Sequence, residues 1–283
     1  VSDVVQIRIF LILQIVVSLG FELFGGDCKS AFLQGGKDPK SAGESDLYLS
    51  QPRNGQLPGL PKGVLLRLKG SAYGKINAPR LWWRKLVGWL LSEGWTRHSM
   101  DPTILMYYRG GQLEAVLGMH VDDIIGGCRS KDIMDSMIER FQWGEFLWDK
   151  LVFCGREVES VVVEGQRRIT VTQKSHNQAI ETVKLPRSRR SELGAPSTPS
   201  EKSDLVSGIG TLQWVGSNTS PPIQAAVSLA QGDTPTVETF GVIQSLLREV
   251  RANENRGIHI LKIPLEKAIL VVFGDGSWAN AQK

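Results

Sequence analysis

Residues 103–126, TILMYYRGGQLEAVLGMHVDDIIG, decide the fold class of this chain. Two long runs of aromatic and branched side chains are separated by Arg109-Gly110-Gly111, and this pattern predicts a hairpin. A third, shorter strand ends the stretch, so Asp122 and Asp123 are expected at the bend of a second hairpin. Because helical patterns stand before and after these antiparallel strands, the sequence predicts an α+β fold.

Further elements are expected on both sides of this stretch. Residues 4–21 predict a buried helix, and 22–26 predict a strand that runs into Asp27. Another helix begins at Pro79, a residue suited to the first helical position, and ends at Gly94. Strands are also expected near 151–157, 160–163, 168–172, 257–263 and 267–274, and helices over 131–141, near 175–184, on both sides of 221–222 and from 235 to about 253.

The most apolar stretch, 9–21, is interrupted by Gln14 and Ser18 and follows Arg8. It is shorter than the roughly 20 apolar residues that cross a bilayer, so we expect no membrane span. A secretory signal segment and a membrane anchor are the competing interpretations. Asp3 and the lack of a clear small-residue cleavage site count against the signal segment.

Hydrophobic residues make up 41% and charged residues 22% of the 283 residues, as in an ordinary globular protein. This composition argues against a disordered chain, a fibre and a disulfide-stapled small domain. The three cysteines, Cys28, Cys128 and Cys154, are far apart and lack C-x-x-C spacing, which indicates neither a disulfide framework nor a cysteine zinc site. An intracellular protein fits best.

Positive charge is concentrated in one segment. The chain carries 33 Lys and Arg against 29 Asp and Glu, a formal charge of +4. Residues 47–92 contain eight bases and no acid, so removing these eight leaves 25 bases against 29 acids and a net charge of −4 elsewhere. This window favours a phosphate-bearing partner, whose binding releases counterions, and a solvated basic surface is the alternative. Its bases are Arg53, Lys62, Arg67, Lys69, Lys75, Arg80, Arg84 and Lys85.

Two features concern the organisation of the chain. Residues 186–203 are rich in Ser, Arg, Pro and Lys and keep no apolar period, which predicts an exposed linker. The sequence begins with Val1 and stops at Lys283, soon after a new motif opens at Phe273, and we expect a fragment of a longer protein.

Three carboxylates are the candidate catalytic groups: Asp27 at the end of a strand, and Asp122 and Asp123 at a hairpin bend. Mg²⁺ prefers a few carboxylate oxygens together with substrate phosphates, and paired ions about 3.5–4 Å apart stabilise the attacking and leaving oxygens. The pattern therefore suits phosphoryl transfer. An Asp-Asp pair alone also fits two turn-forming aspartates, so the surrounding residues decide between the two interpretations.

Several motifs fall in order along the chain: DCKSAFLQG at 27–35, GSAYGKINAPRLW at 70–82 and HVDDII at 120–125. They resemble DVKTAFLNG, KSLYGLKQAPRxW and YVDDIL of the reverse transcriptases of copia-type retrotransposons. Shorter matches to the same family are LYLSQP at 47–52, DP at 101–102, CGREV at 154–158 and IGTLQW at 209–214. The resemblance covers nearly the whole chain, and collinear motifs are far more specific than any one of them.

The resemblance implies a right-hand polymerase with fingers, palm and thumb that acts as an RNA-directed DNA polymerase. Asp27, Asp122 and Asp123 would be the palm carboxylates that hold two Mg²⁺ ions, with Mn²⁺ as a possible substitute. Phe32 matches the position beneath the incoming sugar that excludes a ribose 2′-hydroxyl, and plain core packing is the alternative for this ring.

Further roles follow from the same resemblance. Lys75, Asn77 and Arg80 would meet the nucleotide and the template, in agreement with the acid-free window. Cys154 and Gly155 would begin the hairpin that grips the primer. The expected partners are an RNA template, a DNA primer, deoxynucleoside triphosphates and the integrase and RNase H segments of a Pol polyprotein. The expected location is a cytoplasmic particle or the nucleus.

The resemblance also implies a domain division. Fingers and palm would occupy 1–185, with the N-terminal part of the fingers missing, and a linker would occupy 186–203. A helical thumb would follow over 204–264. The truncated start of an RNase H domain would occupy 265–283, where FGDGSWAN at 273–280 supplies only the first carboxylate of that domain.

Departures from the family pattern keep a second interpretation open. His120 replaces the usual Tyr, Asn77 replaces Gln, and Gly26 and Cys28 flank Asp27. A decayed or domesticated relic would still fold and bind nucleic acid without polymerising.

Overall fold

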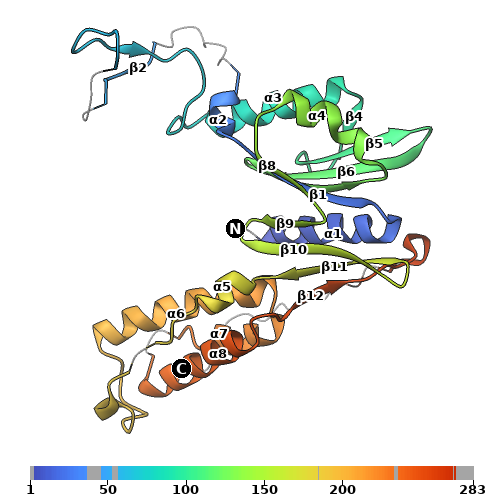
Figure 1. Ribbon diagram of the computed structural model, residues 1–283. Helices are drawn as coiled ribbons and strands as arrows, with labels where there is room; N and C mark the ends of the chain where they lie inside the picture. The colour runs from blue at the N-terminus through green and yellow to red at the C-terminus, as the bar shows by residue number, and fades with distance from the viewer. Residues whose placement is uncertain are drawn as a thin grey trace.

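The computed structural model describes residues 3–36, 46–52, 57–183, 185–232, 235–269 and 271. Two antiparallel sheets lie on either side of helix α1, Asp3–Leu19, and a group of helices extends from the second sheet (Figure 1). This combination of helices and antiparallel strands confirms the predicted α+β class. Within the described part of the chain, no helix has the length and apolar character needed to cross a membrane.

The first sheet has six strands in the order β4-β5-β6-β7-β1-β8. The predicted hairpin between β5 and β6 turns at Gly110-Gly111, where both residues have positive φ, a conformation that glycine adopts without a steric penalty. The strands are β1 Glu22–Cys28, β4 Trp95–Arg97, β5 Ile104–Arg109, β6 Gln112–His120, β7 Asp123–Cys128 and β8 Trp143–Trp148.

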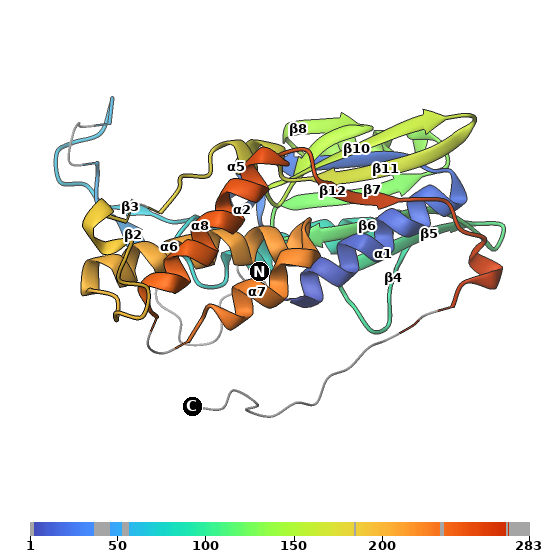
Figure 2. The ribbon, with the colours of Figure 1, turned by 90° about the horizontal axis from the view of Figure 1, so that it is seen from below.

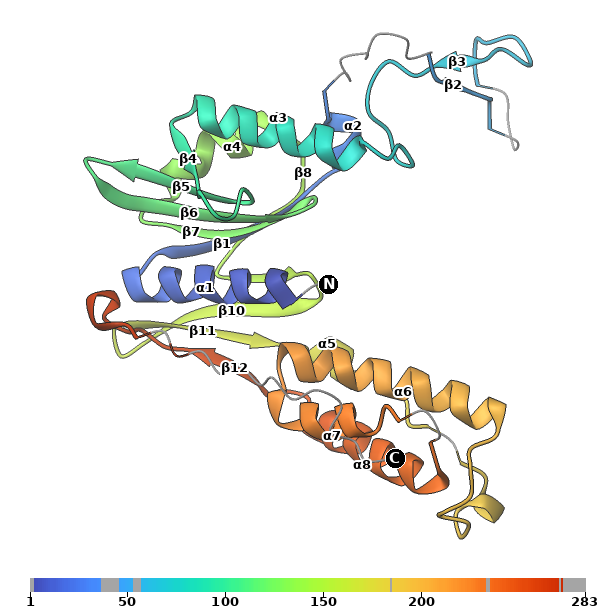
Figure 3. The ribbon, with the colours of Figure 1, turned by 180° about the vertical axis from the view of Figure 1, so that it is seen from behind.

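Helices α3, Ala78–Ser92, and α4, Asp135–Arg140, cover one face of this sheet (Figures 1 and 3). A 3₁₀ turn, Lys131–Met134, precedes α4, and the short helix α2, Ala31–Gln34, follows β1. The buried side of α3 includes Trp82 and Leu86, which share one hydrophobic core with Phe24 of β1 and Leu117 of β6. α3 has Pro79 in its first turn, as the sequence predicts.

α1 packs on the opposite face of the first sheet. Its Ile12 and Val16 are buried and share a core with Ile125 of β7 and Ile169 of β11, so both sheets cover this helix. A Cβ on Gly118 of β6 would collide with Ile12, which shows how closely the helix approaches the strands. The prediction of a buried helix is confirmed, and two sheets together cover its apolar surface.

The second sheet has the order β12-β11-β10-β9, with β9 Lys150–Phe153, β10 Arg156–Val163, β11 Gln166–Thr172 and β12 Gly257–Ile260. The sequence predicted one strand over 151–157. That prediction is wrong, because Cys154 and Gly155 both have positive φ and form the two-residue turn between β9 and β10. β12 lies in the region expected to be a helical thumb, yet it pairs with β11.

The remaining helices form a unit with its own core (Figure 2). They are α5 Lys174–Gln178, α6 Pro199–Asn218, α7 Gln224–Leu229 and α8 Val237–Ala252, with 3₁₀ turns at Arg187–Arg189 and Pro221–Ile223. A further 3₁₀ turn, Leu265–Lys267, follows β12 outside this unit (Figure 3). Leu212 of α6 and Leu247 of α8 are fully buried in this core. α5 is shorter than the helix predicted near 175–184, whereas α6 is a single long helix where a short one was expected.

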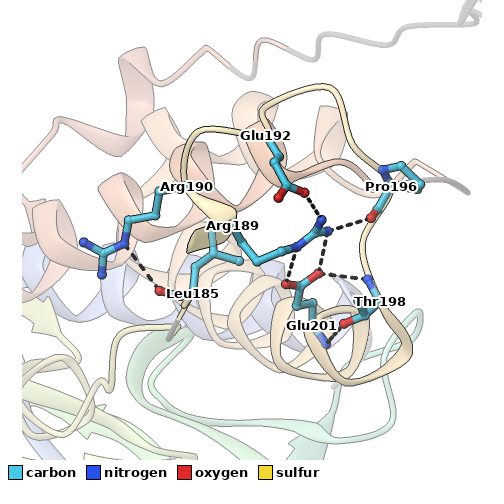
Figure 4. Close-up of polar contacts among 7 residues, drawn as sticks. All are labelled: Leu185, Arg189, Arg190, Glu192, Pro196, Thr198 and Glu201. Atoms are coloured by element: carbon cyan, nitrogen blue, oxygen red, sulfur yellow. Dashed lines mark hydrogen bonds and ion pairs between the residues drawn. The ribbon is translucent and has the colours of Figure 1, made fainter. Parts of the chain in front are cut away.

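Residues 186–203 are mostly exposed, as their composition predicts, but the segment is tied to α6 and is not a free linker. α6 begins within this segment, and Thr198 and Glu201 form a capping box at its start. Arg189 donates from Nε and Nη2 to the two carboxylate oxygens of Glu201, each at 3.1 Å, and also bonds Glu192 and the Pro196 carbonyl (Figure 4). Charge pairing holds this segment in place. A sequence pattern based on the spacing of apolar residues cannot show such pairing.

A small two-stranded sheet, β2 Tyr48–Leu49 and β3 Leu66–Arg67, lies beyond α2 and the start of α3 (Figure 3). At the other end of the chain, half of the strand predicted over 267–274 and the whole motif at 273–280 lie outside the described residues, and the described residues 267–269 and 271 form no strand.

Candidate active site

Asp27 and Asp123 lie side by side on neighbouring strands. β1 and β7 pair so that Asp27 stands opposite Asp123, and residues directly opposite in antiparallel strands share one face of the sheet. Asp122 lies in the adjoining bend between β6 and β7, where its carbonyl accepts a hydrogen bond from the Cys28 amide at 3.2 Å. Strand pairing thus brings together the three aspartates that the sequence singles out.

The bend itself carries a strained residue. His120 and Asp123 are paired, so Val121 and Asp122 form a two-residue turn. Val121 has φ 58°, an uncommon conformation for a β-branched side chain, and it occupies the first turn position, where type II′ hairpins take glycine. Strain of about 1–3 kcal/mol accompanies such a residue. Trp82 of α3 stabilises the bend, because its Nε1 donates to the Val121 carbonyl at 3.0 Å.

The turn at Cys154-Gly155 reaches the aspartates from the second sheet. The Cys154 thiol donates to Oδ2 of Asp123 across an S···O distance of 3.7 Å. Burial, and then the charge of Asp123, raise the pKa of this thiol to about 12, so it keeps its proton and remains a donor. On its other side, a Cβ on Gly155 would lie 3.5 Å from Cζ2 of Trp214 in α6. The turn therefore lies between the aspartate bend and the helical unit.

Negative charge is concentrated at the aspartate bend. Burial, followed by the charges of Asp122 and Asp27, raises the pKa of Asp123 to about 6, and the hydrogen bond from Cys154 opposes this shift only in part. Burial, Asp122 and Glu145 raise the pKa of Asp27. Because the charges that act on these two carboxyls are all negative, a bound cation would relieve their repulsion.

The donor chemistry fits a hard divalent cation such as Mg²⁺ or Mn²⁺, which prefers carboxylate oxygens. In the described part of the chain, no three His, Cys, Asp or Glu side chains form a group that could hold a metal ion. A cation at the bend would therefore take few protein oxygens and complete its shell with water and substrate phosphates, as Mg²⁺ commonly does. Asp27, Asp122 and Asp123 are the residues from which those few oxygens would come.

The residues predicted to meet the nucleotide and template lie around α2 and the start of α3. Phe32 of α2 is half-buried against the core under α3, and its ring centroid is 5.0 Å from that of Tyr73. Lys75 and Asn77 precede α3, and the exposed Arg80 is in its first turn. Since α3 is bonded to the aspartate bend through Trp82, this segment lies next to the bend.

Two residues of β8 belong to the site although the sequence prediction missed them. Glu145 stands opposite Asp27 on the side away from β7. A Cβ on Gly144 would lie 2.8 Å from Oδ2 of Asp27, so glycine leaves the space that this carboxylate occupies. The aromatic-rich segment WGEFLW at 143–148 carried a strand signal that could have revealed both.

The site thus combines an acidic bend at paired strand ends with a basic segment beside it. The chain is 27% identical over 292 residues to a retrovirus-related Pol polyprotein from transposon RE1 of Arabidopsis thaliana, a match that covers 95% of this chain and 18% of that protein. The corresponding protein from transposon RE2 of the same plant is 26% identical over 291 residues, covering 95% and 19%.

A third relative, the retrovirus-related Pol polyprotein from transposon TNT 1-94 of Nicotiana tabacum, is 24% identical over 271 residues, which are 85% of this chain and 19% of that protein. No protein-family model matches the chain. The chain is thus related to the Pol polyproteins of copia-type retrotransposons, and it spans less than a fifth of the length of these relatives.

Proposed function

We propose that this chain is the reverse transcriptase segment of such a polyprotein, an RNA-directed DNA polymerase with a right-hand architecture. The observation that carries the proposal is the meeting of Asp27, Asp122 and Asp123 at the pairing of β1 with β7. The relation to retrovirus-related Pol polyproteins supports it.

In the proposed reaction, the primer 3′-hydroxyl loses its proton to solvent and its oxygen attacks the α-phosphorus of a deoxynucleoside triphosphate. The bond from that phosphorus to the bridging oxygen breaks, and pyrophosphate leaves with the electron pair. Two Mg²⁺ ions, when bound, would supply charge neutralisation at the transferring phosphate. The chain holds the carboxylates in place beforehand: Trp82 fixes the bend, and the Cys154 thiol orients the Asp123 carboxyl. Such preorganisation lowers the reorganisation needed during the reaction.

The substrates of the proposed polymerase would approach from two sides. Phe32, Lys75, Asn77 and Arg80 would contact the incoming nucleotide and the RNA template on the α2–α3 side. The turn at Cys154 and Gly155 would position the DNA primer on the side of the second sheet. Exposed basic side chains on β3 and α3 extend the surface on the α2–α3 side. One of them, Arg67, is paired with Asp46 at 3.3 Å.

One observation favours the alternative, a relic that binds nucleic acid without polymerising. Within the described residues, no set of three metal-ligating side chains is ready to hold an ion. In that case the basic residues would still bind phosphates, because duplex affinity does not depend on the aspartates.

The deciding experiment is primer extension on an RNA template, with Mg²⁺ and separately with Mn²⁺, beside a duplex-binding measurement by fluorescence anisotropy. Asp122→Asn keeps the shape of the side chain and removes its charge. We expect extension to fall by at least about 100-fold while duplex affinity stays near that of the wild type. Asp135→Asn, an exposed position on α4, is the matched control and should extend normally.

The remaining outcomes separate the two functions. A wild-type chain that binds the duplex and never extends the primer with either metal is the relic. A chain that does neither has no role in nucleic-acid synthesis, and the proposal fails.

A further inference from the structure

Arg156 is a fully buried arginine beside the candidate active site. It is the first residue of β10 and directly follows the turn at Cys154-Gly155. Its Nη2 donates to Oδ1 of Asn218, and its guanidinium carbon lies 5.4 Å from the ring centroid of Trp214. Both partners belong to α6, so one side chain joins the turn of the second sheet to the long helix of the helical unit.

The side chain makes fewer hydrogen bonds than it can. In the described part of the chain, Nε and Nη1 of Arg156 are buried without a partner. Burial lowers the pKa of Arg156, because removal from water disfavours the charged form. A buried charge without full pairing is costly, and an apolar side chain of similar length would pack at this place without that cost. Packing alone therefore does not account for an arginine here.

Other contacts between this sheet and α6 are also polar. Gln173, which directly follows β11, is fully buried and accepts a hydrogen bond from the Thr219 hydroxyl at 2.8 Å. Its Nε2 likewise has no partner among the described residues. Hydrogen bonds between polar side chains can re-form in more than one arrangement, whereas tightly packed apolar side chains cannot. Polar contacts of this kind are usual between structural units that move relative to each other.

We propose that Arg156 is a positioning residue that couples the placement of α6 to the aspartate bend. The coupling passes through adjacent contacts: α6 holds Arg156 and lies against Gly155, and the neighbouring Cys154 thiol donates to Asp123. The inference rests on the proposed polymerase function. It adds that movement of the helical unit, as when a primer–template duplex lies against it, regulates the position of the Asp123 carboxyl.

Arg156→Met tests the coupling, since methionine has a similar length and lacks both the charge and the donors. We expect the melting temperature to be equal to or higher than that of the wild type. We also expect faster amide hydrogen exchange at 154–157 and a KM for the primer–template about 2- to 30-fold higher, the range of coupling energies between linked sites.

Arg167→Met on β11 is the matched control. Arg167 is paired with Glu22 at 3.0 Å and with Asp149 at 2.6 Å, so its loss should lower the melting temperature and leave exchange at 154–157 and the KM unchanged. This is the opposite pattern to that expected of Arg156→Met, which distinguishes positioning from plain structural support.

Hydrogen exchange keeps this test separate from the proposed activity. If the wild-type chain extends no primer, the polymerase proposal fails, and exchange at 154–157 alone decides whether Arg156 fixes the turn. If exchange at 154–157 in Arg156→Met equals that of the wild type, the coupling is overturned. It is also overturned if Arg156→Met lowers the melting temperature, as Arg167→Met is expected to do, and keeps the wild-type KM. If Arg156→Met does not fold, Arg156→Lys, which keeps the charge and loses the planar fork, carries the same measurements.

Discussion

Replacing Val121 with glycine should cost almost no stability, although the substitution removes a partly buried side chain. Val121 is 46% exposed, so its loss should cost roughly half of the 1.5–3 kcal/mol for full burial, and glycine adds a backbone entropy cost of about 0.5–1 kcal/mol. The sum is about 1.2–2.5 kcal/mol. Relief of the positive φ returns about 1–3 kcal/mol, so we expect Val121→Gly to lie within about 1 kcal/mol of the wild type.

Val161 of β10 provides the matched control, since it is 41% exposed and its φ is not positive. Val161→Gly should lose the full sum of about 1.2–2.5 kcal/mol, because no strain is relieved there. Urea unfolding measures both variants, and equal slopes against denaturant would show that the unfolded states are comparable. Equal losses in the two variants would refute the claim that the bend is strained.

Three further predictions concern charge and space, two of them at the candidate site and one at the start of α6. Reversing the charges of Lys75 and Arg80 together should reduce the slope of log affinity against log salt by about two units for an RNA–DNA duplex, measured by anisotropy, if each contacts a phosphate. The pKa of Glu201 is lowered to about 2, chiefly by hydrogen bonds from the neighbouring guanidinium, so its stabilising effect is complete above its usual pKa of 4.5 and is lost as pH falls toward 2. Thermal unfolding should therefore show the difference between the wild type and Glu201→Gln shrinking over that range. Gly144→Ala would place a Cβ 2.8 Å from Oδ2 of Asp27, and primer extension should fall by up to about 100-fold with little change in melting temperature.

Local signals account for the parts of the fold that the sequence predicted. The hairpin at Gly110-Gly111 and the start of α3 at Pro79 depend on backbone preferences of one or two residues, which a sequence shows directly. That Asp27 and Asp123 lie close together was predicted from the order of the family motifs and not from the pairing of β1 with β7. The register of β1 against β7 depends on packing across the whole sheet, and no short stretch of sequence encodes it.

The missed features depend on contacts between distant residues. The segment before α6 looks like a linker because its stabilising pair, Arg189 and Glu201, has no apolar period. Glu145 enters the site only because β8 pairs with β1, and β8 was not predicted. The residue pattern alone did not show the turn at Cys154-Gly155, because it lies within an apolar run and a cysteine with positive φ gives no turn signal of its own; only the family resemblance pointed to a hairpin there.

Unfavourable features gather around a single bend. Val121 has a strained backbone, Asp123 is repelled by its neighbours, and Arg156 is buried without full pairing next to the turn that contacts Asp123. An apolar residue at 156 would serve folding better and glycine at 121 would serve it about equally, so stability alone does not explain the residues present. Departures from local rules concentrate where a protein uses them, and a chain that only had to fold and bind phosphates would lose no stability by replacing these residues. Their presence together at the aspartates favours a working catalytic site over a passive relic.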